Sequence, residues 1–198
     1  MLIRKKLGWL LLILGIGFII YPIYIQFQQG KEIEQLEYSL DMIQSGELGK
    51  EDISIDGVDV NDVIRLSIPS IALNQPILAS TSAEHLNVAL TQIKPKQKVG
   101  EGNFTIAGHL SSIDGRHFNR LPEVKIGDEV SVITDTEVYT FEITSSEVIE
   151  ATDVSVLDDR GKSEITLITC TPSGLKRLAV KGQLDRVETM DTKNISSR

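Results

Sequence analysis

The sequence predicts an all-β domain preceded by a single apolar helix. From Val63 onwards, short runs rich in Val, Ile, Thr and Phe are separated by Gly, Pro, Asp and Asn, which is typical of strands joined by turns. Several short strands at this spacing favour a barrel or a sandwich over a parallel α/β sheet. Ahead of them, residues 7–27 carry no charged side chain, and a helix of about 20 apolar residues is what crosses a bilayer.

The apolar segment 7–27 is predicted to be a transmembrane anchor. Trp9 near one end and two tyrosines near the other fit the positions of interfacial aromatic residues. A cleaved signal peptide is the alternative, but its apolar core is shorter and ends in small residues. Three basic residues precede the span, so we expect residues 1–6 in the cytoplasm and the rest outside, in a single-pass topology of the cell membrane.

Residues 28–62 connect the anchor to the β-rich domain. Over 31–45, apolar residues recur at helical spacing and carboxylates occupy the other faces, which predicts an amphipathic helix. This helix could be a stalk or could pack on the domain. Residues 46–62 are acidic and low in large side chains, as in a linker.

The β-rich domain is predicted to span residues 63–187. A short helix is expected over 82–91, where Ser82 can cap its first turn, and Asp135-Thr136 reads as a hairpin turn. The polar residues 188–198 are expected to form a flexible C-terminal tail. The expected strands are 63–68, 76–79, 104–107, 129–134, 137–145, 164–169 and 176–183.

The charge of the exported part excludes some partners. All 28 acidic residues follow residue 27, against 17 basic ones, which gives a formal charge of −11. Nucleic acid is therefore not an expected partner, because phosphate binding needs a basic surface.

Cys170 is the only cysteine in the chain, and it follows the β-branched run 165–169. A single thiol has no partner for an intramolecular disulfide, so Cys170 is a candidate nucleophile. The alternative is a buried cysteine that serves as a small hydrophobic residue.

Two further residues could complete a reactive site. His109 follows a predicted strand and a glycine, and Arg177 lies seven residues after Cys170. A cysteine protease or transferase needs a thiolate, a proton carrier and an oxyanion stabiliser, and these three residues supply one of each. A permanent cation such as Arg177 also favours the thiolate form of a nearby cysteine, although a solvated strand residue is the alternative.

The remaining histidines, His85 and His117, are predicted to be surface or packing residues. A zinc site is not favoured, because one cysteine and three scattered histidines lack the spacing of metal ligands. We therefore predict no metal site.

The chain resembles the sortases, the membrane-bound cysteine transpeptidases of Gram-positive bacteria. The segment 166–170, Thr-Leu-Ile-Thr-Cys, reproduces the signature around the family's nucleophile. Ala107-Gly108-His109 is similar to the segment of the catalytic histidine, and Arg177 with the apolar strand after it is similar to that of the catalytic arginine. The segment 153–158, Asp-Val-Ser-Val-Leu-Asp, resembles the loop that holds the sorting signal.

This resemblance implies a closed β-barrel of about eight strands and an acyl transfer on a Leu-Pro-x-Thr-Gly (LPxTG) sorting signal of surface proteins. Cys170 would attack the threonine carbonyl and expel glycine, and the amine of a peptidoglycan precursor would resolve the thioester. His109 would move the protons and Arg177 would hold the oxyanion. By the same resemblance, the Leu-Pro part of the signal would lie against Ala107, Val154, Val156, Ile168 and Thr169.

The subclass is predicted to be class A, with class D as the alternative and a variant sorting signal in that case. Some class A members bind calcium in the loop before the histidine strand, but here that loop reads Lys-Pro-Lys-Gln-Lys over 94–98. Calcium requires oxygen ligands and ammonium groups repel it, so we expect no cofactor and no calcium activation.

Two other functions remain open on the sequence. One is a non-catalytic extracytoplasmic binding module of the same fold, in which the thiol would be buried and inert. The other is a hydrolytic cysteine peptidase, in which water takes the place of the amine.

Overall fold

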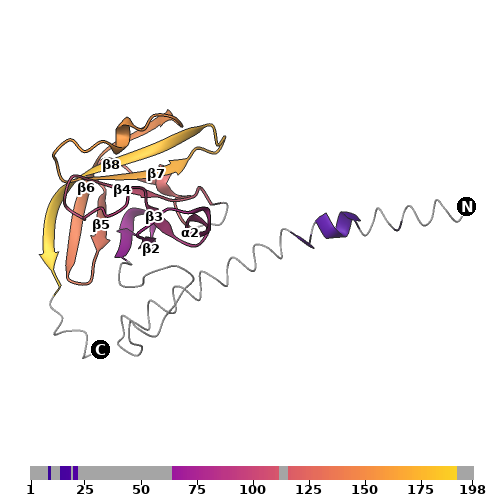
Figure 1. Ribbon diagram of the computed structural model, residues 1–198, viewed down its shortest axis with the longest axis horizontal. Helices are drawn as coiled ribbons and strands as arrows, with labels where there is room; N and C mark the ends of the chain where they lie inside the picture. The colour runs from indigo at the N-terminus through magenta and orange to yellow at the C-terminus, as the bar shows by residue number, and fades with distance from the viewer. Residues whose placement is uncertain (1–8, 10–13, 19, 22–63, 112–115, 191–198) are drawn as a thin grey trace, which may run out of the picture.

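The computed structural model describes residues 9, 14–18, 20–21, 64–111 and 116–190. Eight strands in this part close into a barrel, which confirms the all-β class and the strand number (Figure 1). The strands are β1 (Ile64–Ile68), β2 (Leu73–Leu78), β3 (Leu90–Gln92), β4 (Asn103–Ala107), β5 (Glu129–Ile133), β6 (Glu137–Glu150), β7 (Glu164–Cys170) and β8 (Lys176–Thr189). Their connections include η3 (Pro69–Ile71), α2 (Ala83–Val88), η4 (Leu121–Glu123) and η5 (Ser155–Leu157).

The strand order around the barrel is β1-β2-β3-β4-β7-β8-β6-β5, and β5 pairs with β1 to close it. Two neighbouring pairs are parallel, β2 with β3 and β4 with β7, and the other pairs are antiparallel. The pairing of β4 with β7 places two segments far apart in sequence side by side, with their carboxyl ends at the same edge of the sheet.

The core is filled by alternate residues of the strands, as expected for a sheet with one face turned inward. Phe104 and Ile106 of β4 and Ile165 and Leu167 of β7 are fully buried. Phe118, in the connection between β4 and β5, is also fully buried. This inner set fixes which residues of β4 and β7 point outward, and the candidate site lies on that outer face.

The strongly alternating strands were predicted within a few residues, but β3 was missed. The predicted helix 82–91 ends at Val88, and Leu90–Gln92 form a strand instead. Ser82 does cap the helix, because its hydroxyl accepts a hydrogen bond from the backbone N–H of His85 at 3.0 Å. Three residues are too few to show a strand period, and β3 is held by its long-range pairing with Ile77 and Leu78.

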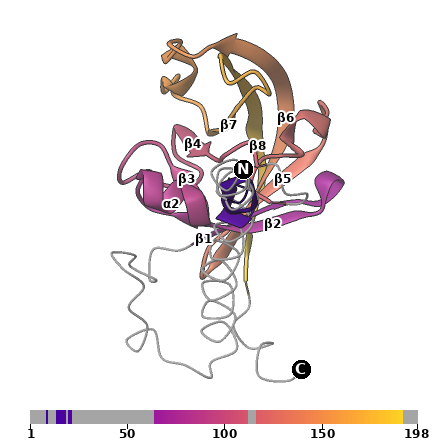
Figure 2. The ribbon, with the colours of Figure 1, turned by 90° about the vertical axis from the view of Figure 1, so that its right-hand side faces the viewer.

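The strands β6 and β8 are each 14 residues long and run side by side (Figures 1 and 2). Register shifts after Thr140 and after Ile143 allow β6 to bend, and Figure 2 shows its second half curving while it stays paired with β8. The hairpin turn at 135–136 is present, with Thr134 and Glu137 hydrogen-bonded at 2.9 Å. β8 reaches Thr189, so residues 188 and 189, which we expected in the tail, belong to a strand.

Most of the predicted anchor 7–27 and all of the stalk and linker 28–62 lie outside the described residues. Among the residues that are described, no helix is both long enough and apolar enough to cross a membrane.

Candidate active site

The candidate nucleophile lies at the carboxyl end of β7, directly opposite the candidate arginine. The antiparallel register of β7 and β8 pairs Cys170 with Arg177. Directly opposed residues of two strands point to the same face of a sheet. Because Leu167 on β7 and Val180 on β8 are buried in the core and lie at the alternate positions, Cys170 and Arg177 both face outward. Both side chains are partly exposed.

His109 reaches the same edge of the sheet from β4. The β4–β7 ladder pairs Ala107 with Ile168, and the N–H of Gly108 continues it by donating to the Ile168 carbonyl at 3.1 Å. A Cβ on Gly108 would lie 2.6 Å from both Leu90 and Phe118, so position 108 faces the core. The alternation therefore turns His109 outward, and its side chain is exposed.

The turn between β7 and β8 holds the guanidinium of Arg177. Nη1 donates to the carbonyls of Gly174 and Lys176, each at 3.1 Å. The turn is tightened by Gly174, which has a positive φ of 71° and donates to the Thr171 carbonyl at 2.8 Å. The other N–H groups of Arg177 make no hydrogen bond to any described residue, so they can donate to an anion on the substrate.

Cys170 and Arg177 form one cross-strand row, called here the reactive row. A second row of small and apolar residues lies next to it, further from the strand ends. The registers align Ala107 on β4, Ile168 on β7 and Ala179 on β8, on the same outward face as Cys170. Val156, in η5, is 9% exposed. It belongs to the segment that lies over this face, because Asn103 of β4 donates to its carbonyl at 2.9 Å.

The outward face is covered beyond this row by η5 and its flanks. Asn103 also donates to the Asp158 carbonyl at 3.2 Å and accepts from the hydroxyl of Thr166 at 2.7 Å. The ammonium of Lys94 donates to the Leu157 carbonyl at 2.8 Å. These contacts tie the connection between β6 and β7 to β4, β7 and the connection before β4, so this connection lies next to the second row.

Of the five residues expected to line the groove, two have side chains that do not lie on the outward face beside the second row. Thr169 occupies an inward position, because it alternates with Ile165 and Leu167, and it is 2% exposed. Its backbone lies beside the groove but its side chain faces the core. Val154 lies ahead of η5 and is 68% exposed, so it stands at the rim. Ala107, Val156 and Ile168 occupy positions that suit a groove.

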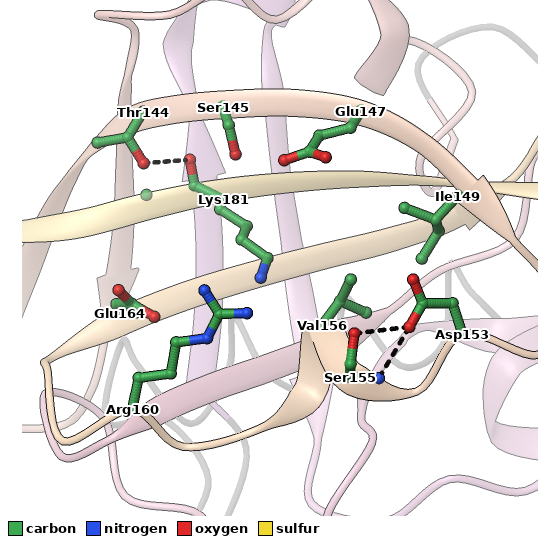
Figure 3. Close-up of a pocket in the computed structure, with 11 residues that line it drawn as sticks. Thr144, Ser145, Glu147, Ile149, Asp153, Ser155, Val156, Arg160, Glu164 and Lys181 are labelled. Atoms are coloured by element: carbon green, nitrogen blue, oxygen red, sulfur yellow. Dashed lines mark hydrogen bonds between the residues drawn. The ribbon is translucent and has the colours of Figure 1, made fainter.

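A polar cavity of about 340 Å³ is lined by residues of β6, β7, β8, η5 and the segments that flank η5 (Figure 3). Figure 3 shows the amine of Lys181 and the guanidinium of Arg160 pointing into it, while Asp153 is bound to the N–H and hydroxyl of Ser155. Cys170, His109 and Arg177 do not line this cavity, but Ile149 and Glu147 of its lining pair with Arg177 and Ala179. The cavity therefore adjoins the row of Cys170 and Arg177 on the same outward face. Its lining consists of Thr144, Ser145, Glu147, Ile149, Asp153, Ser155, Val156, Arg160, Glu164, Lys181 and Gly182.

The structure shows His117 as a packing residue beside His109. His117, expected to be a surface or packing histidine, is 3% exposed, and its ring stands edge-on to that of His109, with the centroids 6.3 Å apart. Burial, followed by the charge of Arg116, lowers the pKa of His117 to about 4. In the sequence, only its position after His109 and next to Gly115-Arg116 pointed to this contact between the two histidines.

The arrangement suits acyl transfer by a cysteine. The candidate nucleophile, the candidate proton carrier and a guanidinium lie at the ends of three neighbouring strands, with small and apolar residues in the next row. Such a set can form and resolve a thioester on an extended peptide.

Comparison with known proteins agrees with this reading. The sequence profile described as "Sortase domain" matches residues 66–185. Sortase A of Bacillus anthracis is 29% identical over 191 residues, which cover 88% of this chain and 91% of that protein. Sortase A of Listeria monocytogenes is 31% identical over 136 residues, which cover 67% of this chain and 60% of that protein. The solved structure of Listeria monocytogenes sortase A has a TM-score of 0.64 at 28% identity, covering 70% of this chain and 94% of the solved one. The chain therefore belongs to the sortase family of cysteine transpeptidases.

Proposed function

We propose that this sortase cleaves an LPxTG-type sorting signal between Thr and Gly and transfers the surface protein to an amine of a peptidoglycan precursor. The observation that carries the proposal is the row of Cys170 and Arg177 on one face, with His109 at the end of the adjoining strand. Two relatives named sortase A support a class A enzyme.

In the first half of the reaction, the sulfur of Cys170 attacks the carbonyl carbon of the substrate threonine. The N–H groups of Arg177 that are not held by the turn donate to the oxyanion that develops. His109 gives a proton to the departing glycine nitrogen, so the C–N bond breaks and a thioester remains.

In the second half, an amine attacks the thioester carbonyl and His109 accepts its proton. The C–S bond breaks, the new amide bond forms, and Cys170 is released as the thiolate. Water in place of the amine would give hydrolysis as a side activity.

The groove is proposed to select the Leu-Pro part of the signal. Ala107 and Ile168 form its floor and Val156 one wall, with Val154 at the rim. An extended peptide rises about 3.3 Å per residue, as does the strand below it. A threonine carbonyl at Cys170 therefore places the preceding residues over the row that contains Ile168.

The proposed enzyme needs no metal. The ammonium of Lys94 already joins the connection before β4 to η5, and Lys96 and Lys98 lie in the same connection. Cations at these positions repel calcium. We expect turnover of chelator-treated enzyme to change less than twofold with millimolar calcium, and a several-fold rise would contradict this.

We also propose that residues 7–27 anchor the enzyme in the cell membrane, with the N-terminus in the cytoplasm and the barrel outside. The uncharged run after three basic residues supports this orientation. Protease digestion of intact cells should remove the barrel and spare an N-terminal tag, and a protected barrel would contradict the orientation.

The activity is tested by mass spectrometry of products from the full chain, a Leu-Pro-x-Thr-Gly peptide and a glycine-based amine. We expect a transfer product that forms only with the amine, and none from Cys170→Ala. His85→Ala, on α2, is the matched control and should retain full activity. Cleavage that persists in Cys170→Ala would refute the proposal. Hydrolysis alone would favour the peptidase, and cleavage of only a variant motif would favour class D.

A further inference from the structure

His117 adopts a left-handed backbone conformation, which is uncommon outside glycine although histidine is among the residues that tolerate it. Its φ is 51°, in the left-handed region that residues other than glycine rarely occupy. Such conformations persist where the surrounding structure imposes them, and they gather at functional sites. The side chain is nevertheless almost completely buried, and its ring lies at 80° to the ring of His109.

The backbone around the two histidines is paired directly. The N–H of Phe118 donates to the His109 carbonyl at 3.1 Å, and Leu110 forms an isolated bridge with His117. The N–H of His117 donates to the side-chain oxygen of Gln75 on β2 at 3.1 Å. These contacts hold His117 and His109 in a fixed relation to the barrel.

One hydrogen bond at the His117 ring indicates its tautomer, since Nδ1 is buried and has no hydrogen-bond partner among the described residues. The Nε of Arg116 donates to Nε2 of His117 at 3.3 Å, so Nε2 is an acceptor and a neutral ring carries its proton on Nδ1. Burial lowers the pKa of His117 most, and the charge of Arg116 lowers it further. The backbone of Asn87 raises this pKa, and His109 lowers it slightly. The described groups that face His117 are thus the charged or titratable Arg116 and His109 and the neutral Gln75 and Asn87.

We propose that His117 is the positioning residue for His109. Its uncharged ring fixes the orientation of the His109 ring, and because it stays uncharged, His109 can carry a proton without a second imidazolium beside it. A like charge at this distance would disfavour the protonated form, which is the form that must protonate the leaving amine. The inference rests on the catalytic role of His109 proposed above.

Two substitutions at position 117 distinguish the effect of the ring on His109 from the effect of the left-handed backbone. His117→Asn suits the left-handed backbone but removes the ring, whereas His117→Phe keeps an uncharged ring beside His109. In the full chain we expect kcat to fall at least tenfold in His117→Asn with KM for the sorting peptide within twofold. In His117→Phe we expect kcat within threefold of the wild type. His85→Asn is the matched control, and thermal unfolding shows whether each variant is folded.

The charge state has its own readout, which does not depend on catalysis. NMR of the labelled rings should show His117 uncharged at pH 6 with its proton on Nδ1. Arg116→Gln should raise the midpoint of the His117 titration, because it removes the neighbouring cation. It should also move the acid limb of the kcat/KM profile, whereas Arg116→Gln combined with His117→Phe should leave that limb in place.

Two results would overturn the inference: an imidazolium at His117 at pH 6, or equal losses of kcat in folded His117→Asn and His117→Phe. A failure of the proposed function looks different, because His109→Ala would then retain activity while the NMR titration of His117 stayed as described.

Discussion

Asn103 links the barrel to the segment that bounds the groove, and its removal tests this part of the structure quantitatively. Its side chain is 4% exposed and makes three hydrogen bonds, to the carbonyls of Val156 and Asp158 and from the hydroxyl of Thr166. Each such bond contributes about 1 kcal/mol net. Asn103→Ala should therefore lower the free energy of unfolding by about 3 kcal/mol, or the Tm by about 10 °C.

The substitution should also loosen η5, because two of its three lost bonds end on that segment and its flank. KM for the sorting peptide should then rise several-fold while kcat changes little, since Cys170 and Arg177 are held by a separate pairing. Urea denaturation of the full chain and steady-state peptide kinetics measure the two effects. Asn74→Ala, an exposed asparagine on β2, is the matched control and should cost less than about 0.5 kcal/mol. An Asn103→Ala variant as stable as Asn74→Ala would refute the reasoning.

Three further predictions follow from the geometry of the site. Arg177→Lys should lower kcat by about 100-fold with the fold intact, because an ammonium cannot replace the fixed fork of N–H donors; a loss under threefold would contradict this. Gly108→Ala should cost about 1–3 kcal/mol of stability, measured by denaturation, and lower kcat, because its Cβ would press on the buried ring of Phe118 and displace His109; a stable, fully active variant would count against it. For His117, the folded pKa is about 4 and the unfolded one about 6.5, so the unfolded chain binds more protons between these values. Stability should therefore fall by up to about 3 kcal/mol as the pH drops through this window, and His117→Phe should flatten that slope.

The fold could be predicted where local pattern and position agree. Strands such as β5 and β7 alternate regularly between inner and outer residues, and their bounds came out within a residue. β3 could not be predicted, because its three residues are all buried and follow a helix without a turn signal. The outer halves of β6 and β8 were also missed. They are largely exposed, and each is held by pairing with the first half of the other strand, which a search for buried alternation does not detect.

The residues of the candidate site could be predicted from their chemistry and their positions next to strands, but their proximity could not. Cys170, His109 and Arg177 could be chosen because each follows or begins a strand, but only the register of β4, β7 and β8 places them at one edge. The inward side of Thr169 follows from its alternation with Ile165 and Leu167 along β7. The contact between His117 and His109 depends on pairing within the connection after β4, which spacing along the chain does not encode.

The central claim is that Cys170 forms an acyl bond with the substrate threonine and passes it to an amine. Intact-protein mass spectrometry of the full chain, quenched in acid during turnover of a Leu-Pro-x-Thr-Gly peptide, measures this directly. We predict an adduct with the mass of the peptide up to its threonine, located on Cys170 and lost when a glycine-based amine is added. Turnover without that adduct, or an adduct on another residue, would contradict the account.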